Sequence, residues 1–245
     1  EYLEPQDEEE FTATQEHLIQ AGYRAKSAVR TFYFAQFALG LGLLILGLIY
    51  TLFLAPEETS ATKAALMTLV PGLVGYYLPR YWVNKRIKAR QGEIQDGFPD
   101  SLDLMLVCVE AGQSLDQSIV RVAAELHASY PELAEEFEIV AFEMKAGKEK
   151  SAVLRDMGTR CGVQDVSSFV TVLIQSQQFG TSIADALRVY AAEMRDKRVM
   201  RAEEKANQLP TKMTLTTMAL TVPPLLIILV GPSAVGITQM GNIGQ

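Results

Sequence analysis

The sequence predicts an all-α, polytopic membrane protein with three transmembrane helices and one cytoplasmic antiparallel helical bundle built from two related helical hairpins. Three observations predict this fold class. Long uncharged stretches occur near both ends of the 245-residue chain. Most basic residues flank these stretches in a way that favours one side of a membrane. The segment between them repeats an apolar pattern with the period of an α-helix.

The candidate membrane spans are three stretches without a charged residue, at 31–56, 64–79 and 213–245. A bilayer core about 30 Å thick requires roughly 20 apolar residues in a helix. The first and last stretches meet this requirement, and the middle one meets it only when its interfacial end is extended to Val83. We therefore expect transmembrane helices at 31–56, 64–83 and 213–238.

The basic residues predict the orientation. Of the 22 Lys and Arg residues, all except Lys63 fall on one side if the three stretches cross the membrane. Because Lys and Arg are retained in the cytoplasm, that side is expected to be cytoplasmic. The expected parts are a cytoplasmic segment with an amphipathic helix at 1–30, a periplasmic loop at 57–63, a cytoplasmic bundle at 84–212 and a periplasmic tail at 239–245. The chain begins at Glu1 rather than at a methionine, so we expect an upstream segment in the full protein.

The bundle is predicted from apolar stripes. Positions 0, 4, 7, 8 and 11 counted from Phe98, Leu115, Leu133 and Ile183 are apolar in every case, which is typical of one face of a helix. Shorter helices are expected at 151–160 and from about residue 165 to 179. Because each stripe needs an apolar partner, the helices are expected to pack into one bundle.

An internal repeat relates residues 111–126 to residues 179–194. Both contain Gly-x-Ser followed by Leu or Ile, and both then contain Ala-Ala-Glu. We expect the glycine to end one helix in a left-handed conformation and the serine to cap the next helix. The candidate hairpin turns, which we also interpret as hinges, are Gly112, Ser114, Gly180 and Ser182. Duplication is the favoured explanation, and the alternative is that separate helical hairpins acquired similar turns.

The sequence contains no motif that indicates catalysis. A Gly-x-x-x-x-Gly-Lys-[Ser/Thr] phosphate loop and a Gly-x-Ser-x-Gly nucleophile elbow are both missing. His17 and His127 are far apart and are interpreted as surface residues, while Cys108 and Cys161 are interpreted as free thiols. The predicted spans have no ionisable residue in their interiors, which argues against a transporter. We therefore expect no enzyme activity, no cofactor and no metal site.

Five glutamates crowd one predicted helix of the acidic bundle: Glu132, Glu135, Glu136, Glu138 and Glu143. Such a surface makes nucleic acid an unexpected partner. The glutamates form either a solvated helix face or a docking face for a basic partner protein. The basic segment 80–90 is expected to set the topology and to contact anionic lipid headgroups. In the first span, Gly40 and Gly47 lie on one face and favour close helix contacts within an oligomer.

Three stretches carry a resemblance to a known family. Residues 96–119, which read DGFPDSLDLMLVCVEAGQSLDQSI, resemble the start of a type II secretion system F domain (the GspF or T2SSF domain), and residues 178–187 resemble its second hairpin. Residues 18–28 are similar to the segment before the first span in the TadC branch, the platform proteins of the tight adherence (Tad/Flp, type IVc) pilus. The resemblance covers about residues 15–238, including the order of two spans, bundle and final span.

This resemblance implies an inner-membrane platform protein, or scaffold, of a Tad or type IV pilus or of a type II secretion-like machine. Such a protein couples a cytoplasmic assembly ATPase to pilin extraction and pilus assembly. The implied partners are a TadB-like paralogous platform protein, a TadA-like ATPase, Flp-type prepilins, membrane lipid and further subunits of an oligomer. A single bundle, where the general secretion and type IVa platform proteins have two, favours the Tad branch. The alternative is a small membrane transporter subunit without catalytic activity, which titratable groups in the spans would favour.

Overall fold

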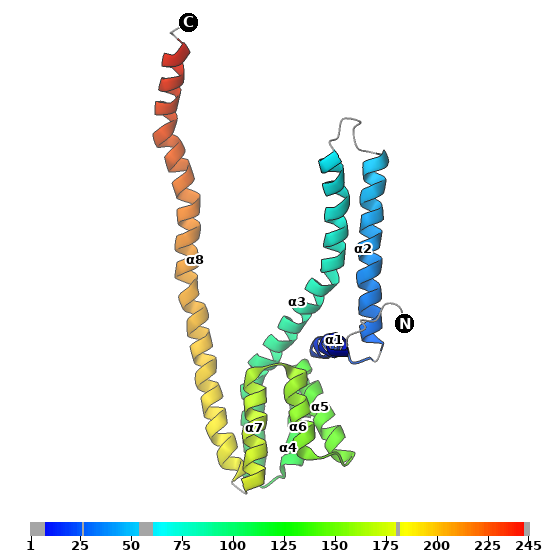
Figure 1. Ribbon diagram of the computed structural model, residues 1–245. Coiled ribbons are helices and arrows are strands. Elements are labelled where there is room, and N and C mark those ends of the chain that lie inside the picture. The colour runs from blue at the N-terminus through cyan, green and yellow to red at the C-terminus, as the bar shows by residue number, and fades with distance from the viewer. Residues whose placement is uncertain (1–7, 26, 54–60, 180–181, 243–245) are drawn as a thin grey trace. The chain divides into compact units, whose positions relative to one another are not determined.

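The computed structural model describes residues 8–25, 27–53, 61–179 and 182–242, and these contain helices and no strand (Figure 1). The helices are α1 (Glu8–Gln20), α2 (Ala28–Phe53), α3 (Ala61–Glu110), α4 (Leu115–Leu126), α5 (Pro131–Lys145), α6 (Lys150–Cys161), α7 (Gln164–Phe179) and α8 (Ile183–Asn242). The all-α class is therefore confirmed for the described residues. The predicted N-terminal segment, external loop and tail lie partly outside them, at 1–7, 54–60 and 243–245. Two compact units, Glu1–Ala192 and Glu193–Gln245, divide the chain within α8.

In the first unit, α2 runs antiparallel to the first half of α3 (Figure 1). Glycines allow the two backbones to approach closely. A Cβ atom on Gly75 would lie 2.6 Å from the carbonyl oxygen of Leu39, and one on Gly47 would lie 3.1 Å from that of Met67. A Cβ atom on Gly40 would also meet α3, 3.6 Å from a side-chain atom. The two glycines that the sequence suggested as oligomer contacts therefore face a helix of their own chain.

Two helices of the described chain are long and apolar enough to cross a membrane. The mean hydropathy of an 18-residue window reaches 2.1 within Ala28–Thr51 of α2 and 2.0 within Ile183–Val230 of α8. The predicted span at 64–83 is not apolar enough to be identified as a span in the same way, so hydropathy supports two spans and not three. The physical reason is composition, because this part of α3 includes polar, small and proline residues such as Thr68 and Pro79.

The helix α3 continues through the boundary that the sequence predicted at residue 84. It is one helix of 50 residues with Pro71, Pro79 and Pro99 inside it. Figure 1 shows that α3 changes direction between the hairpin with α2 and the bundle. A proline within a helix removes one backbone hydrogen bond and favours a bend without ending the helix. One continuous helix therefore belongs to both the hairpin and the bundle.

The bundle consists of α4 to α7 with the end of α3 and the start of α8, around an apolar core. The buried side chains of the predicted stripes are Phe98, Leu102 and Met105 in α3, Leu115, Ile119, Val122, Ala123 and Leu126 in α4, Leu133, Phe137 and Val140 in α5, and Leu187, Tyr190 and Ala191 in α8. Phe98 and Phe169 pack edge to face with their ring centroids 5.6 Å apart. The Tyr190 hydroxyl donates a hydrogen bond to the carbonyl oxygen of Asp165 at 2.8 Å. The apolar stripes of the sequence thus form the core of the bundle.

The predicted hairpin turns have backbone and side-chain geometry that fits their sequence. Gly112 has a φ of +86°, a left-handed conformation that glycine adopts without steric cost. The Ser114 hydroxyl oxygen accepts a hydrogen bond from the backbone N–H of Gln117 at 3.3 Å. Ser182 accepts an equivalent bond at 3.3 Å from the N–H three residues later, so each serine caps the helix that follows it. Gly180 lies outside the described residues, and the hinge role of these positions stays a prediction.

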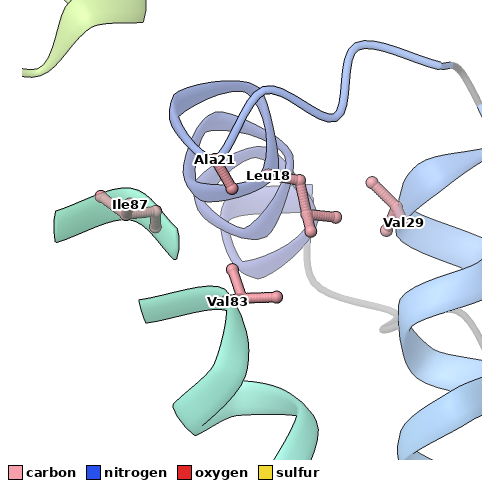
Figure 2. Close-up of a cluster of buried hydrophobic side chains, with 5 residues drawn as sticks. All are labelled: Leu18, Ala21, Val29, Val83 and Ile87. Atoms are coloured by element: carbon pink, nitrogen blue, oxygen red, sulfur yellow. The ribbon is translucent and has the colours of Figure 1, made fainter. Parts of the chain in front are cut away.

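The short helix α1 lies against α2 and α3 where the hairpin meets the bundle. A separate apolar cluster holds it there (Figure 2), formed by Leu18, Ala21, Val29, Val83 and Ile87. The hydroxyl groups of Thr14 in α1 and Tyr33 in α2 also share a hydrogen bond of 3.1 Å. Burial of the cluster explains why a helix of only 13 residues is held in place.

The second unit consists of the rest of α8. All side chains from residue 202 to residue 230 are exposed, and they change from charged to apolar after Lys212. Four threonine hydroxyls donate to the carbonyl four residues earlier at 2.7–2.9 Å: Thr214, Thr216, Thr217 and Thr221. Because these polar groups are satisfied within the helix, the segment suits an apolar environment.

Candidate functional site

Four arginines and four glutamates form a network of ion pairs between α3, α5, α6 and the segment that follows α1, here called the Arg–Glu network. Its members are Arg24, Arg86, Arg90, Arg160, Glu132, Glu135, Glu136 and Glu143. Arg24 lies in the segment after α1, Arg86 and Arg90 lie on α3, and Arg160 lies on α6. All four glutamates lie on α5. The four arginines balance the four glutamates in formal charge, and Lys148 adds one more cation through its pair with Glu143.

Glu136 is the centre of the network. Its side chain is fully buried, and its Oε1 accepts hydrogen bonds from Arg24 at 2.6 Å and from Arg90 at 2.9 Å. Its Oε2 accepts a bond from Nε of Arg160 at 2.8 Å. Arg90 is itself only 2% exposed. Because a buried carboxylate needs charged donors in place of water, these bonds fix the position of α5 against the other segments.

Glu132 and Glu135 extend the network toward solvent. Glu132 pairs with Arg90 at 2.6 Å and also with Arg86. Glu135 pairs with Arg24 and, at 3.4 Å, with Arg90. The Glu135 side chain is 47% exposed, so water screens its pairs more than those of Glu136. The buried centre therefore carries most of the network's structural effect.

Helical spacing explains why these side chains meet. Arg86 and Arg90 lie four residues apart on α3, and Glu132 and Glu136 lie four residues apart on α5. Residues four apart lie on the same face of a helix, so two packed helices can match two such pairs. The sequence predicted that the basic segment 80–90, which includes both arginines, sets the topology and contacts anionic lipid headgroups. The matching four-residue spacing was the signal that could have indicated the network.

The glutamates predicted as a docking face differ in their surroundings. Glu132, Glu135, Glu136 and Glu143 pair with cations of the same chain. The buried Glu136 does not belong to any surface, which corrects the predicted face at this position. Glu138 is exposed and forms no ion pair within the part of the chain that the structure describes. A docking role for the exposed members stays a prediction, and Glu138 is the strongest candidate among them.

A cleft of about 550 Å³ lies beside the network. Tyr23 and Trp82 form one wall with their ring centroids 6.0 Å apart, and His127 and Glu138 also line the cleft. The remaining charged groups of its wall, including Arg90, already pair within the network. The cleft therefore offers a solvent-accessible surface with aromatic and acidic character rather than a set of reactive groups.

The described residues contain no group of three or more His, Cys, Asp or Glu side chains that could hold a metal ion. Cys108 is half-buried, Cys161 is buried, and both are free thiols. Burial raises the pKa of Cys161 to about 12, and the negative charge of Glu136 acts in the same direction. A thiol with such a pKa stays protonated at neutral pH and is a poor nucleophile.

The stretch that carries the strongest resemblance, from residue 96 onward, forms a tight contact between α3 and the start of α5. Gly97 faces the ring of Tyr130, and a Cβ atom at position 97 would lie 2.5 Å from that ring. The Tyr130 hydroxyl donates a hydrogen bond to Asp100 at 2.9 Å. Phe98, which follows Gly97 in α3, is buried in the bundle core. The motif thus specifies how two helices pack.

The chain was compared with protein-family models, curated proteins and solved structures. The family model described as type II secretion system (T2SS), protein F matches residues 101–231, which is more than half of the chain. No curated protein and no solved structure matched. The matched region includes most of the bundle, the buried Glu136 and the apolar part of α8. This protein therefore belongs to the type II secretion system protein F family.

Proposed function

We propose that this protein is an inner-membrane platform protein of a pilus-assembly machine in the Tad, or type IVc, branch. The family match over residues 101–231 carries the proposal, because a type II secretion system protein F domain fits a membrane platform protein of secretion or pilus machinery. Two apolar helices are compatible with insertion into a membrane. The resemblance of the segment at 18–28 to the TadC branch supports this choice within the family.

The proposed topology includes a membrane hairpin of α2 and the first half of α3. Hydropathy does not identify α3 as a span, so packing supports this part of the proposal. Gly40 meets Tyr76 and Gly47 meets Met67, so the two helices run side by side over at least two turns. If α2 spans the membrane, α3 lies at the same depth along this contact. The basic segment that follows Arg80 would then remain in the cytoplasm with the bundle, and the end of α8 would be periplasmic.

The proposed mechanism is mechanical. A TadA-like cytoplasmic ATPase would move the bundle, and α3 would carry this motion to the hairpin because it is one continuous helix. The Arg–Glu network supports such coupling, since breaking buried ion pairs is costly and the network joins α3 to α5, α6 and the segment that follows α1. The membrane helices would then act on Flp-type prepilins, together with a TadB-like paralogue in an oligomer.

The proposal is tested in the source bacterium by deleting the gene and restoring it as a tagged full-length chain. We expect the deletion to abolish surface pili and the tagged chain to co-purify with the assembly ATPase. Normal piliation of the deletion strain would contradict the platform role.

The docking face is tested separately by the charge reversal Glu138→Lys. Glu125→Lys is the matched control, because Glu125 is also an exposed helical glutamate but lies on α4. We expect Glu138→Lys to weaken co-purification with the ATPase and Glu125→Lys to leave it unchanged. Equal co-purification of both variants would show that Glu138 does not contact the ATPase.

A further inference from the structure

A second cavity, with a volume of about 320 Å³, lies where α1 meets α2 and α3. It adjoins the apolar cluster of Figure 2, and Leu18 and Val83 belong to both. Its polar lining comes from three helices: Thr14 and His17 of α1, Tyr33 and Gln36 of α2, and Arg80 and Asn84 of α3. With Tyr76 of α3, seven side chains that carry polar atoms thus line one space that is continuous with an apolar wall.

Gln36 is the first sign that this cavity receives a ligand. The residue is only 6% exposed, and its side-chain amide has no hydrogen-bond partner among the residues that the structure describes. It lies within the apolar segment Ala28–Thr51 and lines the cavity, so a polar occupant of the cavity could bind its amide. A ligand with oxygen atoms would satisfy this amide.

The charge of the lining indicates the kind of ligand. Arg80 carries a full positive charge and forms no ion pair within the described ranges of the chain. Among the residues that the structure describes, no Asp or Glu lines the cavity. Asn84 can donate further hydrogen bonds, and so can whichever hydroxyl of the Thr14–Tyr33 pair accepts the bond between them. One cation with several neutral donors and no carboxylate suits an anion with several oxygen atoms, such as a phosphate group.

The position of the cavity indicates where that phosphate comes from. Gln36 lies near the start of the apolar segment of α2, and Arg80 opens the basic segment of α3, which is the composition of a cytoplasmic membrane interface. We infer that this cavity binds the phosphate of an anionic headgroup at the membrane surface. A glycerophospholipid and a soluble phosphate ester share this chemistry, and the apolar wall beside the phosphate favours the lipid. Only the membrane depth of the cavity rests on the proposed function.

Lipid retention by the purified full-length chain tests this inference. Native mass spectrometry in a neutral detergent would follow binding of phosphatidylglycerol, phosphatidylcholine and glycerol 3-phosphate. We expect Arg80→Gln to lower phosphatidylglycerol retention about tenfold, because one charge-assisted contact is lost. We expect Gln36→Leu, which keeps a similar volume without the amide, to lower it several-fold. Lys85→Gln is the matched control, because it removes the same charge from α3 outside the cavity.

The outcomes separate the possible explanations. Wild-type retention in both cavity variants, an equal loss in Lys85→Gln, or equal binding of phosphatidylcholine and phosphatidylglycerol would each overturn the inference. Competition by glycerol 3-phosphate would support a soluble phosphate ester, and retention of the lipid despite this competitor would support the phospholipid. The measurement needs neither ATPase nor pilin, so its failure would leave the platform role untouched.

Discussion

At the scale of single residues, Glu136 shows how a buried charge depends on its neighbours. Its carboxylate has lost contact with water, and the guanidinium groups of Arg24, Arg90 and Arg160 replace that hydration. The net contribution of such a group is limited, because removing each charge from water costs free energy. Removing one member is different, since the others then remain buried with less opposite charge. The network therefore opposes rearrangement more than it increases stability.

Glu136→Gln tests this view of the network. The substitution keeps the shape of the side chain and removes its charge, so Arg90 remains buried with a weaker partner. We expect the free energy of unfolding to fall by about 3 kcal/mol, which lowers the Tm by roughly 10 °C in thermal unfolding in detergent. Glu138→Gln on the exposed side of the same helix is the control and should leave the Tm unchanged. Equal Tm values for both variants would contradict a structural role for the buried centre.

Cys161 provides a prediction on pH. Burial raises its pKa from 9.0 to about 12, so the folded chain disfavours the thiolate. Its contribution to stability is fully present below about pH 9 and falls as the pH rises toward 12, because the unfolded chain ionises first. At pH 8 we expect a maleimide to modify the half-buried Cys108 at least about a hundredfold faster than Cys161, as measured by peptide mass spectrometry. Equal rates in the folded chain would contradict this prediction, and equal rates after denaturation are the control.

At the scale of elements, α3 shows that one helix can contain contacts of very different kinds. Near its start, Gly75 lets the backbone of α2 approach, while Gly97 makes room for the ring of Tyr130 in the bundle. Gly92 between them meets nothing within 4 Å. The sequence alone does not distinguish these three glycines. Their structural roles differ because the atoms that surround each of them differ.

Alanine substitutions at Gly97 and Gly92 form a matched pair. A Cβ atom at position 97 would overlap the Tyr130 ring, so we expect Gly97→Ala to destabilise the bundle by about 1–3 kcal/mol. Gly92→Ala places a methyl group in open space within a helix and should stabilise the chain by up to about 1 kcal/mol. Denaturant unfolding of both variants measures the difference. A Gly97→Ala variant as stable as the wild type would show that Tyr130 moves aside without cost.

The elements themselves were largely predictable from the sequence, whereas their lengths were not. The stripe from Leu115 to Leu126 predicted a buried helical face, and the capping serine at position 114 predicted the start of that helix. The predicted end of a span at residue 83 does not coincide with a helix end, because α3 continues to Glu110, and the membrane boundary there stays a prediction. Periodicity reports which face of a helix is buried, but it does not report where a polar and an apolar segment join in one helix.

At the scale of the whole molecule, the first unit connects an apolar hairpin to a polar bundle through contacts that span long distances in the sequence. Arg24, which follows α1, meets Glu136 across 112 residues, and the apolar cluster of Figure 2 holds α1 against α2 and α3. If the hairpin lies in a membrane, the bundle must remain on the side to which the basic end of the hairpin points. This placement determines which surfaces a cytoplasmic ATPase can reach.

The placement is tested with the native thiol of Cys108 and a maleimide that cannot cross membranes. We expect labelling in inverted inner-membrane vesicles, because the thiol is half-buried and the proposed topology has the bundle on the cytoplasmic face. Intact spheroplasts should remain unlabelled, and detergent lysis of the same spheroplasts provides the control for reactivity. Labelling of Cys108 from the periplasmic side would contradict the proposed topology.

The sequence by itself determined the helical class, the apolar faces and the chemistry of the turns at Gly112 and Ser114. These features depend on neighbours within one or two turns of the chain. Only the tertiary structure decided that Glu136 is buried among arginines, that Gln36 lines a cavity and that the glycines of α2 face α3. Such contacts join residues that lie far apart in the sequence, and their partners are fixed by how whole helices pack.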